Sequence, residues 1–221
     1  MAGDATIRAI LLDFDGLMVD TESPIFELWA EVFRDHGQEL RLDDWKHALG
    51  TQGGYDPVGH LGRLTGKSLD ASALERDVRR RHRKACRSQP LLPGVMELLE
   101  DATRADLPVA VASSSSGGWV REWLEHHALD ERIAVLCARE DVARVKPAPD
   151  LFLLAASRLG VAPAACLVFE DSPNGILAAH AAGMRCVAVR NDLTRSLALP
   201  PSELLLESLA GVSLMEIAAR L

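Results

Sequence analysis

The fold of this protein is decided by residues 10–21, which read Ile10-Leu11-Leu12-Asp13-Phe14-Asp15-Gly16-Leu17-Met18-Val19-Asp20-Thr21. The apolar run predicts a strand, and side chains alternate between the two faces of an extended chain. Asp13 and Asp15 therefore point the same way, and Gly16 lets the chain turn directly after them. Two crowded carboxylates repel unless a cation lies between them or one holds a proton. The pair predicts a divalent metal site with nucleophile and acid chemistry, and an acidic strand end facing water is the alternative.

The chain has the composition of a globular protein with an acidic surface. Of its 221 residues, 48% are hydrophobic and 25% are charged, which is ordinary for a folded protein. The length fits one domain with an insertion. The net charge of −8 argues against nucleic acid as a partner, because phosphate backbones require a basic surface. An anionic substrate meets the same repulsive field, so its site must carry positive charge of its own.

The cysteines and the N-terminus predict a cytoplasmic protein without a membrane segment. Cys86, Cys137, Cys166 and Cys186 lack the spacing of a metal site, and we interpret them as reduced core thiols. The first apolar run is interrupted by Asp13, which speaks against a signal peptide, and no run approaches the length of a membrane span. The sequence does not fix the oligomeric state, for which a monomer is the working expectation.

The C-terminal half alternates between predicted strands and predicted helices. Short apolar runs predict strands at 7–13, 108–112, 133–137, 166–169 and 186–189. Helical spacing of apolar residues predicts helices at 119–124, 151–159 and 176–182. Continuous apolar strands alternating with helices are typical of a parallel sheet that is covered on both faces. We therefore predict a three-layer α/β core with a Rossmann-like parallel sheet.

Residues 20–92 contain no convincing strand and predict an all-helical insertion. An apolar helical stripe begins at Ile25, and further helical stretches are expected at 42–49, 56–65 and 70–87. We therefore divide the chain into a core, residues 1–19 and 93–221, and a helical cap, residues 20–92. The connections at 16–21 and 88–94 would then be hinges between the two.

Polar residues follow three of the predicted strands, and a lysine precedes a helix. They are Asp13 and Asp15, the run Ser113 to Ser116, Glu170-Asp171-Ser172, and Lys146 before Pro147. Sites in open parallel sheets form at the carboxyl ends of strands. Alone, each group has a plainer interpretation, as a helix cap, a surface lysine or a turn. Together they supply a nucleophile, hydroxyl donors, a cation and metal-binding carboxylates, which suits phosphoryl transfer.

These groups resemble the four motifs of the haloacid-dehalogenase superfamily of phosphohydrolases. The matching residues are Asp13-Phe14-Asp15-Gly16, Ser113 after an apolar strand, Lys146-Pro147 and Glu170-Asp171. The match covers essentially the whole chain. The insertion resembles the small helical cap of the subgroup that contains β-phosphoglucomutase, phosphoglycolate phosphatase and sugar-phosphate phosphatases. The resemblance specifies the superfamily and leaves the substrate open.

The resemblance implies catalytic and metal-binding roles for four carboxylates. Asp13 would attack phosphorus to form an aspartyl-phosphate. Asp15 would protonate the leaving oxygen and then activate water. Mg²⁺ would be held by Asp13, by the main-chain carbonyl of Asp15 and by Asp171. Glu170 would either bind the ion directly or contact one of its ligands. The residues agree with this, because clustered carboxylates select a hard cation with oxygen ligands.

The resemblance also implies which residues bind phosphate. Ser113 would donate a hydrogen bond to the transferring phosphoryl group, and Lys146 would neutralise that group and Asp13. Gly16 and Ser114, which are neighbours of these motif residues, are further candidates for binding phosphate.

Cap residues that face the site are expected to set its specificity. The candidates are Thr21, which matches the hinge threonine of the subgroup, Gly50, Thr51 and Gln52 of a glycine-containing loop, and Asn174. That loop is either a substrate loop, because glycines allow close backbone approach, or a plain helix–helix turn. The basic run at 79–84 could attract an anion, but six successive residues cannot all face one pocket. Trp119 is expected to pack in the interior, and no histidine has a spacing that demands a role.

Two alternatives remain beside a phosphatase. A mutase resembling β-phosphoglucomutase would need a hinge histidine and a cap arginine, whereas this chain has Ile25 at the matching position and no arginine in the loop 49–54. A non-catalytic binding protein would gain support if a motif residue were missing, and none is. The resemblance also implies that Asp15 argues against carbon–halogen and carbon–phosphorus cleavage, because the relatives with those activities lack an aspartate at this position. We therefore predict a Mg²⁺-dependent phosphatase whose partner is a small phosphorylated metabolite, such as a sugar phosphate.

Overall fold

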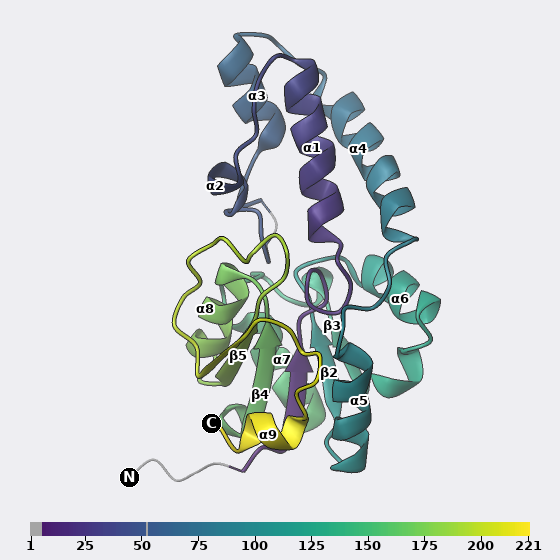
Figure 1. Ribbon diagram of the computed structural model, residues 1–221, viewed down its shortest axis with the longest axis vertical. Coiled ribbons are helices and arrows are strands. Elements are labelled where there is room, and N and C mark those ends of the chain that lie inside the picture. The colour runs from purple at the N-terminus through teal and green to yellow at the C-terminus, as the bar shows by residue number, and fades with distance from the viewer. Residues whose placement is uncertain (1–5, 52) are drawn as a thin grey trace.

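A computed structural model describes residues 6–51 and 53–221 of the chain (Figure 1). Its centre is a parallel sheet in the order β3-β2-β1-β4-β5-β6. The strands are β1 (Ala9–Leu12), β2 (Val109–Ala112), β3 (Val135–Cys137), β4 (Cys166–Glu170), β5 (Arg185–Val189) and β6 (Leu204–Leu206). The predicted fold class, a Rossmann-like parallel sheet with flanking helices, is confirmed.

Alternation along the strands separates the core into two apolar clusters. In β1, Ile10 and Leu12 pack on one face of the sheet, and Ala9 and Leu11 pack on the other. The first face is covered by α5 (Val95–Arg104), α6 (Gly117–His126) and α9 (Leu214–Ala218). The second face is covered by α7 (Asp150–Leu159) and α8 (Pro173–Ala181). Both faces of the sheet are therefore shielded from solvent, which fits the continuous apolar runs of its strands.

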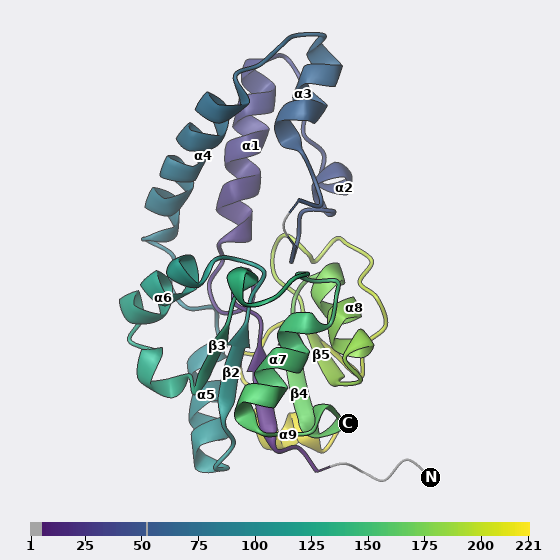
Figure 2. The same ribbon diagram turned by 180° about the vertical axis from the view of Figure 1, so that it is seen from behind.

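The helices between β1 and α5 extend from the carboxyl end of the sheet (Figures 1 and 2). They are α1 (Glu22–Asp35), α2 (Leu42–Trp45), α3 (Pro57–Thr65) and α4 (Ala71–Cys86). We call these helices and their loops the cap. They enclose an apolar cluster of their own, with Trp29, Phe33 and Leu61 at its centre, and Leu193 of the core packs against it. That the cap is a separate domain moving on hinges stays a prediction.

Several element boundaries differ from those expected. The helix expected at 42–49 ends at Trp45, and the helix expected from residue 176 begins at Pro173. The hydroxyl of Ser172 accepts the main-chain N–H of Gly175, and this N-cap starts the helix early. Three elements were not predicted, α5, β6 and α9, and three 3-10 turns lie at Asp130–Arg132, Arg139–Asp141 and Pro163–Ala165.

The four cysteines are buried and carry free thiols, as expected. Among residues 6–51 and 53–221, no helix has both the length and the apolar character needed to cross a membrane. The cytoplasmic location and the monomeric state stay predictions.

Candidate active site

The carboxyl ends of the strands bring the predicted charged residues together beneath the cap. Asp13 directly follows β1, and its main-chain N–H donates to the carbonyl of Phe169 in β4 at 3.1 Å. Lys146, which lies between β3 and α7, donates from Nζ to Asp13 Oδ1 at 2.5 Å and to Glu170 Oε1 at 2.6 Å. These three side chains are at most 3% exposed. A lysine between two buried carboxylates is therefore the electrostatic centre of the site.

Burial controls the protonation of this cluster. It raises the pKa of Asp13 to about 8, against the lowering effect of Lys146. Burial also raises the pKa of Asp171, which Glu170 and Asp13 raise further by repulsion. Burial alone lowers the pKa of Lys146, but Asp13 and Glu170 outweigh it and raise that pKa, so the lysine stays charged. One lysine does not neutralise three carboxylates, and a divalent cation would complete the charge balance.

The acidic cluster has the donors that a magnesium ion needs. Asp13, Glu170 and Asp171 each offer an oxygen, and these oxygens lie within 4.8 Å of one another. Among the described residues, the buried Oδ1 of Asp171 has no hydrogen-bond partner. A buried carboxylate oxygen without a partner is costly, and a cation would remove that cost. The residues present therefore fit a hard divalent ion.

Glu170 is bonded differently from the other two acids. Its Oε1 accepts from Lys146, and its Oε2 accepts from the main-chain N–H groups of Asp171 and Ser172 and from the Ser172 hydroxyl, at 2.9 to 3.0 Å. These four donors satisfy both oxygens of Glu170. Asp13 and Asp171 are therefore the better candidates for direct metal ligands, with Glu170 orienting Lys146 behind them.

Gly16 and Asn191 fix the position of Asp171. The Nδ2 atom of Asn191 donates to Asp171 Oδ2 at 2.8 Å and to the carbonyl of Gly16 at 2.9 Å. Gly16 has φ = +86°, and a Cβ there would lie 2.5 Å from Asp171 Oδ2. Only glycine allows this close approach, which brings the loop after β1 against the acidic cluster. The contacts of Gly16 therefore lie beside the acidic cluster, and its role in binding phosphate stays a prediction.

Asp15 stands apart from that cluster and is half-buried. Its Oδ1 accepts hydrogen bonds from the Thr21 hydroxyl at 2.7 Å and from the Trp119 indole at 2.8 Å. Its Oδ2 accepts one from the Ser113 hydroxyl at 3.2 Å. Asp13 and Asp15 both line one cavity, as the alternation of an extended segment predicts. One carboxylate is thus enclosed with charges, and the other is exposed to the space that a substrate would enter.

The cavity between core and cap has a volume of about 400 Å³. Ile25 and Trp45 give it an apolar side, and Arg79 and His82 of α4 together with Arg139 of the core give it a polar side. Arg79 and His82 are three residues apart, so they share one face of α4. Other cations of the run, Arg80, Arg83 and Lys84, line an adjoining groove, which shares Arg79 and Trp119 with the cavity. The basic run thus contributes one arginine to the cavity.

Three hydrogen bonds hold the cap loop against the core. Thr51 Oγ1 donates to the carbonyl of Lys146 at 2.5 Å, Ser114 Oγ to the carbonyl of Gly50 at 2.9 Å, and Asn174 Nδ2 to the carbonyl of Leu49 at 2.8 Å. Gly50, Thr51 and Ser114 also line the cavity, whereas Asn174 does not. The described part of the loop therefore closes one side of the cavity. Gln52, another expected specificity residue, lies outside the described residues.

The sequence analysis did not predict the roles of four residues of the site. Ser172 and Asn191 bind the acidic residues, and Trp119 binds Asp15 instead of only packing. Glu22, which follows the recognised Thr21, lines the cavity, and burial and nearby carboxylates raise its pKa. The position of Glu22 next to Thr21 could have identified it as a residue of the site. No such signal points to Trp119, which lies 104 residues from Asp15 in the chain.

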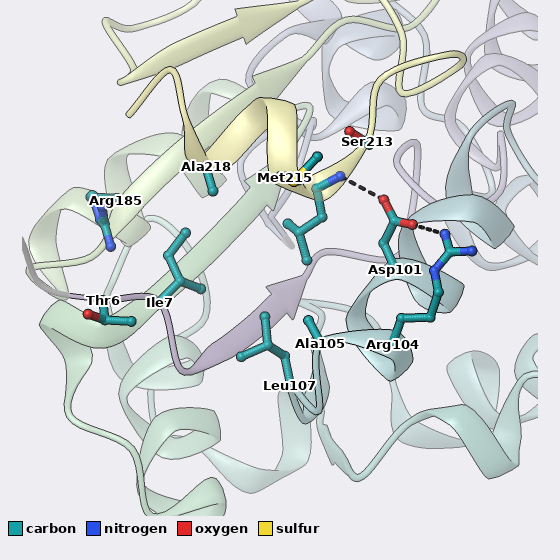
Figure 3. Close-up of a pocket in the computed structure, with 11 residues that line it drawn as sticks. Thr6, Ile7, Asp101, Arg104, Ala105, Leu107, Arg185, Ser213, Met215 and Ala218 are labelled. Carbon is teal, nitrogen blue, oxygen red and sulfur yellow. Dashed lines mark hydrogen bonds and ion pairs between the residues drawn. The ribbon is translucent and has the colours of Figure 1, made fainter.

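A second cavity, of about 680 Å³, lies near the amino ends of β1, β2 and β5, away from the acidic cluster (Figure 3). It opens between α5, α9 and the start of β1, and Ile7, Leu107 and Met215 contribute apolar surface. Asp101 faces it, but its carboxylate accepts a hydrogen bond from the main-chain N–H of Leu214 at 2.8 Å and forms an ion pair with Arg104. No residue singled out from the sequence lines this cavity, and its one acid is already satisfied.

Comparison with known proteins agrees with this geometry. The model of the haloacid dehalogenase-like hydrolase family matches residues 10–189. The YhcW protein of Bacillus subtilis is 41% identical over 208 residues, which cover 94% of each chain. The fructose-1-phosphate phosphatase YqaB of Escherichia coli is 35% identical over 185 residues, or 82% of this chain and 95% of that protein.

A solved structure shows the same arrangement over the whole chain. CbbY from Rhodobacter sphaeroides, in a complex of a variant with xylulose-1,5-bisphosphate, has a TM-score of 0.77 and 29% identity, and the match covers 96% of this chain and 99% of that one. The family match spans the four motifs and all the residues of the acidic cluster. This chain belongs to the haloacid dehalogenase-like hydrolases, as a phosphatase of the group that resembles β-phosphoglucomutase.

Proposed function

We propose that this protein is a Mg²⁺-dependent phosphatase that hydrolyses a small phosphorylated metabolite through an aspartyl-phosphate on Asp13. The observation that carries the proposal is the pair of Asp13 and Lys146 beside the unpartnered oxygen of Asp171, directly under a cavity. Asp13 and Asp171 would hold the ion together with the main-chain carbonyl of Asp15. When bound, Mg²⁺ supplies charge neutralisation between the carboxylates and the phosphoryl oxygens.

Asp13 is suited to be the nucleophile. Its Oδ1 is engaged by Lys146, which leaves Oδ2 to attack phosphorus. Lys146 is held by Glu170 from behind, so it keeps its place while charge moves from Asp13 to the phosphoryl group. Ser113 lines the cavity and would donate its hydroxyl to a phosphoryl oxygen. These groups position and neutralise, which is most of what phosphoryl transfer requires.

Asp15 is suited to move protons in both halves of the reaction. It lies at the cavity rather than in the acidic cluster, within reach of a leaving oxygen. It would protonate that oxygen as the bond to phosphorus breaks, and then take a proton from the water that attacks the aspartyl-phosphate. The same carboxylate thus serves as acid and then as base.

The cavity limits the substrate to a small molecule with a polar body. Its volume of about 400 Å³ is close to the lower end for ligand pockets. Arg79 and Arg139 supply the local positive charge that an anionic substrate needs near an acidic protein. One relative is named as a phosphatase of fructose 1-phosphate, and another was solved with a xylulose bisphosphate. These names support a sugar phosphate as the substrate.

The mutase alternative is disfavoured by Ile25 rather than by a lack of charge. Ile25 lines the cavity, at the position where the resembled mutase carries a histidine that partners the acid. An isoleucine offers neither a proton nor a charge to Asp15. The loop provides no arginine among its described residues, but Arg79 and Arg139 reach the cavity from elsewhere. Water is therefore the expected acceptor of the phosphoryl group.

The test is a panel of phosphorylated metabolites assayed with Mg²⁺ for release of inorganic phosphate. We expect sugar phosphates to show the highest kcat/KM, and β-glucose 1-phosphate, if used, to give glucose and phosphate. Conversion of that substrate to glucose 6-phosphate faster than phosphate release would move the protein to the mutases. Absence of turnover across the whole panel would favour a binding protein instead.

A further inference from the structure

Three donors from three segments hold the carboxylate of Asp15. Oδ1 accepts two short hydrogen bonds, from the Thr21 hydroxyl at 2.7 Å and from the Trp119 indole nitrogen at 2.8 Å. Oδ2 accepts a longer one, from the Ser113 hydroxyl at 3.2 Å. Two donors satisfy Oδ1, whereas Oδ2 keeps lone-pair capacity for another partner. The arrangement therefore distinguishes the two oxygens of the acid.

Trp119 differs from the two hydroxyl groups in its chemistry. An indole nitrogen donates and cannot accept, so Trp119 cannot take the proton that Asp15 must give. A hydroxyl rotates freely, whereas the indole is a rigid ring at a fixed place on α6. That helix is capped by Ser116, whose hydroxyl accepts the main-chain N–H of Trp119 at 3.3 Å. The start of α6 thus determines where the indole N–H points.

The cap holds both donors of Oδ1 through one residue. The ring of His82 on α4 stacks on Trp119, with 5.2 Å between centroids and 22° between planes. Its Nε2 is 2.7 Å from the main-chain carbonyl of Thr21. Burial lowers the pKa of His82, and because a carbonyl only accepts, Nε2 is the nitrogen that donates. The face of the His82 ring therefore packs on Trp119, and its Nε2 bonds to the main chain of Thr21.

We propose that Trp119 is a positioning residue that orients Asp15 for proton transfer through Oδ2, and that His82 makes this orientation depend on the cap. The inference rests on the proposed function. As Asp13 forms its bond to phosphorus, the electron pair of the breaking P–O bond stays on the leaving oxygen, which receives the proton from Oδ2. In the second half, Oδ2 takes a proton from water as the oxygen of that water bonds to phosphorus and Asp13 is released.

The leaving group of the substrate provides the test. An alkyl phosphate has a poor leaving group that needs the proton, whereas 4-nitrophenyl phosphate has a good one that hardly needs it. The variant Trp119→Phe keeps an aromatic ring for His82 to stack on, and it loses the indole N–H together with the five-membered ring that carries it. The matched control is Trp123→Phe, one turn later on α6, because the indole nitrogen of Trp123 has no hydrogen-bond partner among the described residues.

We expect Trp119→Phe to lower kcat/KM for the best alkyl phosphate of the panel by roughly ten- to a hundredfold, as displacement of a catalytic group does. The value for 4-nitrophenyl phosphate should fall by no more than about threefold, since that step needs little acid. Trp123→Phe should change both values by one common factor. An equal loss on both substrates in Trp119→Phe, or no loss on either, overturns the positioning role while the wild-type enzyme remains a phosphatase.

The His82 variants keep the inference testable if Trp119→Phe fails to fold by circular dichroism. His82→Ala removes both contacts and should show the same selective loss on the alkyl phosphate, whereas His82→Phe keeps the stacked ring and should lose less. Equal losses on the two substrates in His82→Ala would contradict the link to the cap. A wild-type enzyme that turns over neither substrate removes the proposed function, and the role of Trp119 with it.

Discussion

Two regions with different kinds of interaction meet at the cavity: the cap, and the carboxyl ends of the core strands with the loops that follow them, which we call the core edge. The core edge places Asp13, Lys146 and Glu170 almost completely out of water and joins them by ion pairs. The cap contributes the exposed Arg79 and the half-buried His82, and its loop is held by hydrogen bonds to main-chain carbonyls. The difference supports the proposal that the carboxyl ends of the strands carry the chemistry, where each charge depends on the others, while the cap controls position and access.

The largest effect should come from the nucleophile. Asp13→Asn replaces a carboxylate by an amide, which is a poor nucleophile, so turnover should fall by roughly 10⁴-fold or more. The measurement is phosphate release, with trapping of the phosphoenzyme by acid quench. Asp101→Asn is the matched control, because Asp101 faces the second cavity and should leave kcat unchanged. Substantial activity of pure Asp13→Asn protein would refute the aspartyl-phosphate mechanism.

Metal removal should have the next largest effect. A phosphate dianion cannot enter beside Asp13, Glu170 and Asp171 without a compensating cation. Excess chelator should therefore abolish phosphate release. Added Mg²⁺ should restore phosphate release. Ca²⁺ should restore little of it, because Ca²⁺ is a larger ion with a more flexible coordination geometry. Undiminished activity in chelator would show that Lys146 alone neutralises the site.

A change in the cap loop should have a smaller effect and tests whether the cap only positions. At Gly50 a Cβ would lie 1.9 Å from Ser172 Oγ, whereas at Gly53 it would meet nothing within 4 Å. Both glycines have positive φ, at +69° and +76°, so alanine carries a similar backbone strain at each. Gly50→Ala should lower kcat/KM by roughly ten- to a hundredfold through displacement of the loop.

The Gly53→Ala variant isolates that contact from backbone strain, so it should stay close to wild type in kcat/KM. Equal losses in the two variants would assign the effect to strain. If Gly50→Ala were as inactive as Asp13→Asn, the cap loop would be as necessary for turnover as the nucleophile, and the expected difference in role between the cap and the core edge would be wrong.

The smallest effect is a pH-dependent shift in thermal stability of the metal-free protein. Burial raises the pKa of Asp13 from 3.8 to about 8, so between these pH values the folded state holds a proton that the unfolded state has lost. The resulting stability is complete below pH 3.8 and is lost as pH rises toward 8. Mg²⁺ replaces that proton, so it should raise Tm more at pH 8 than at pH 5. A Mg²⁺ shift that does not change with pH would contradict the raised pKa.

Much of the core edge could be predicted because its signals are local. The apolar strands, the Asp13 and Asp15 pair and the motif residues Lys146 and Glu170 each stand in short segments with a recognisable pattern. Residues at the ends of parallel strands must meet, whatever the details of packing. Helix limits were less accurate, because a single capping hydroxyl such as that of Ser172 moves them by several residues.

The remaining features depend on contacts between distant segments. Asn191 lies 175 residues from Gly16 in the chain, and its side chain bonds that carbonyl and Asp171 together. The basic run gave no indication that Arg79 and His82 would face the cavity while Arg80 and Arg83 would not. That choice depends on how α4 is rotated against the core, which the packing of its apolar face decides.

The family, the parallel sheet and the residues that meet at the carboxyl ends of its strands could be read from the amino-acid sequence alone, because strand periodicity and motif order are properties of short segments. Three features follow from the packed chain: Glu170 is satisfied by four donors, an oxygen of Asp171 has no partner among the described residues, and Asp15 accepts from Trp119, on which His82 stacks. Hydrogen-bond saturation and ring contact depend on the orientation of side chains from separate elements, and that orientation exists only when the chain is packed.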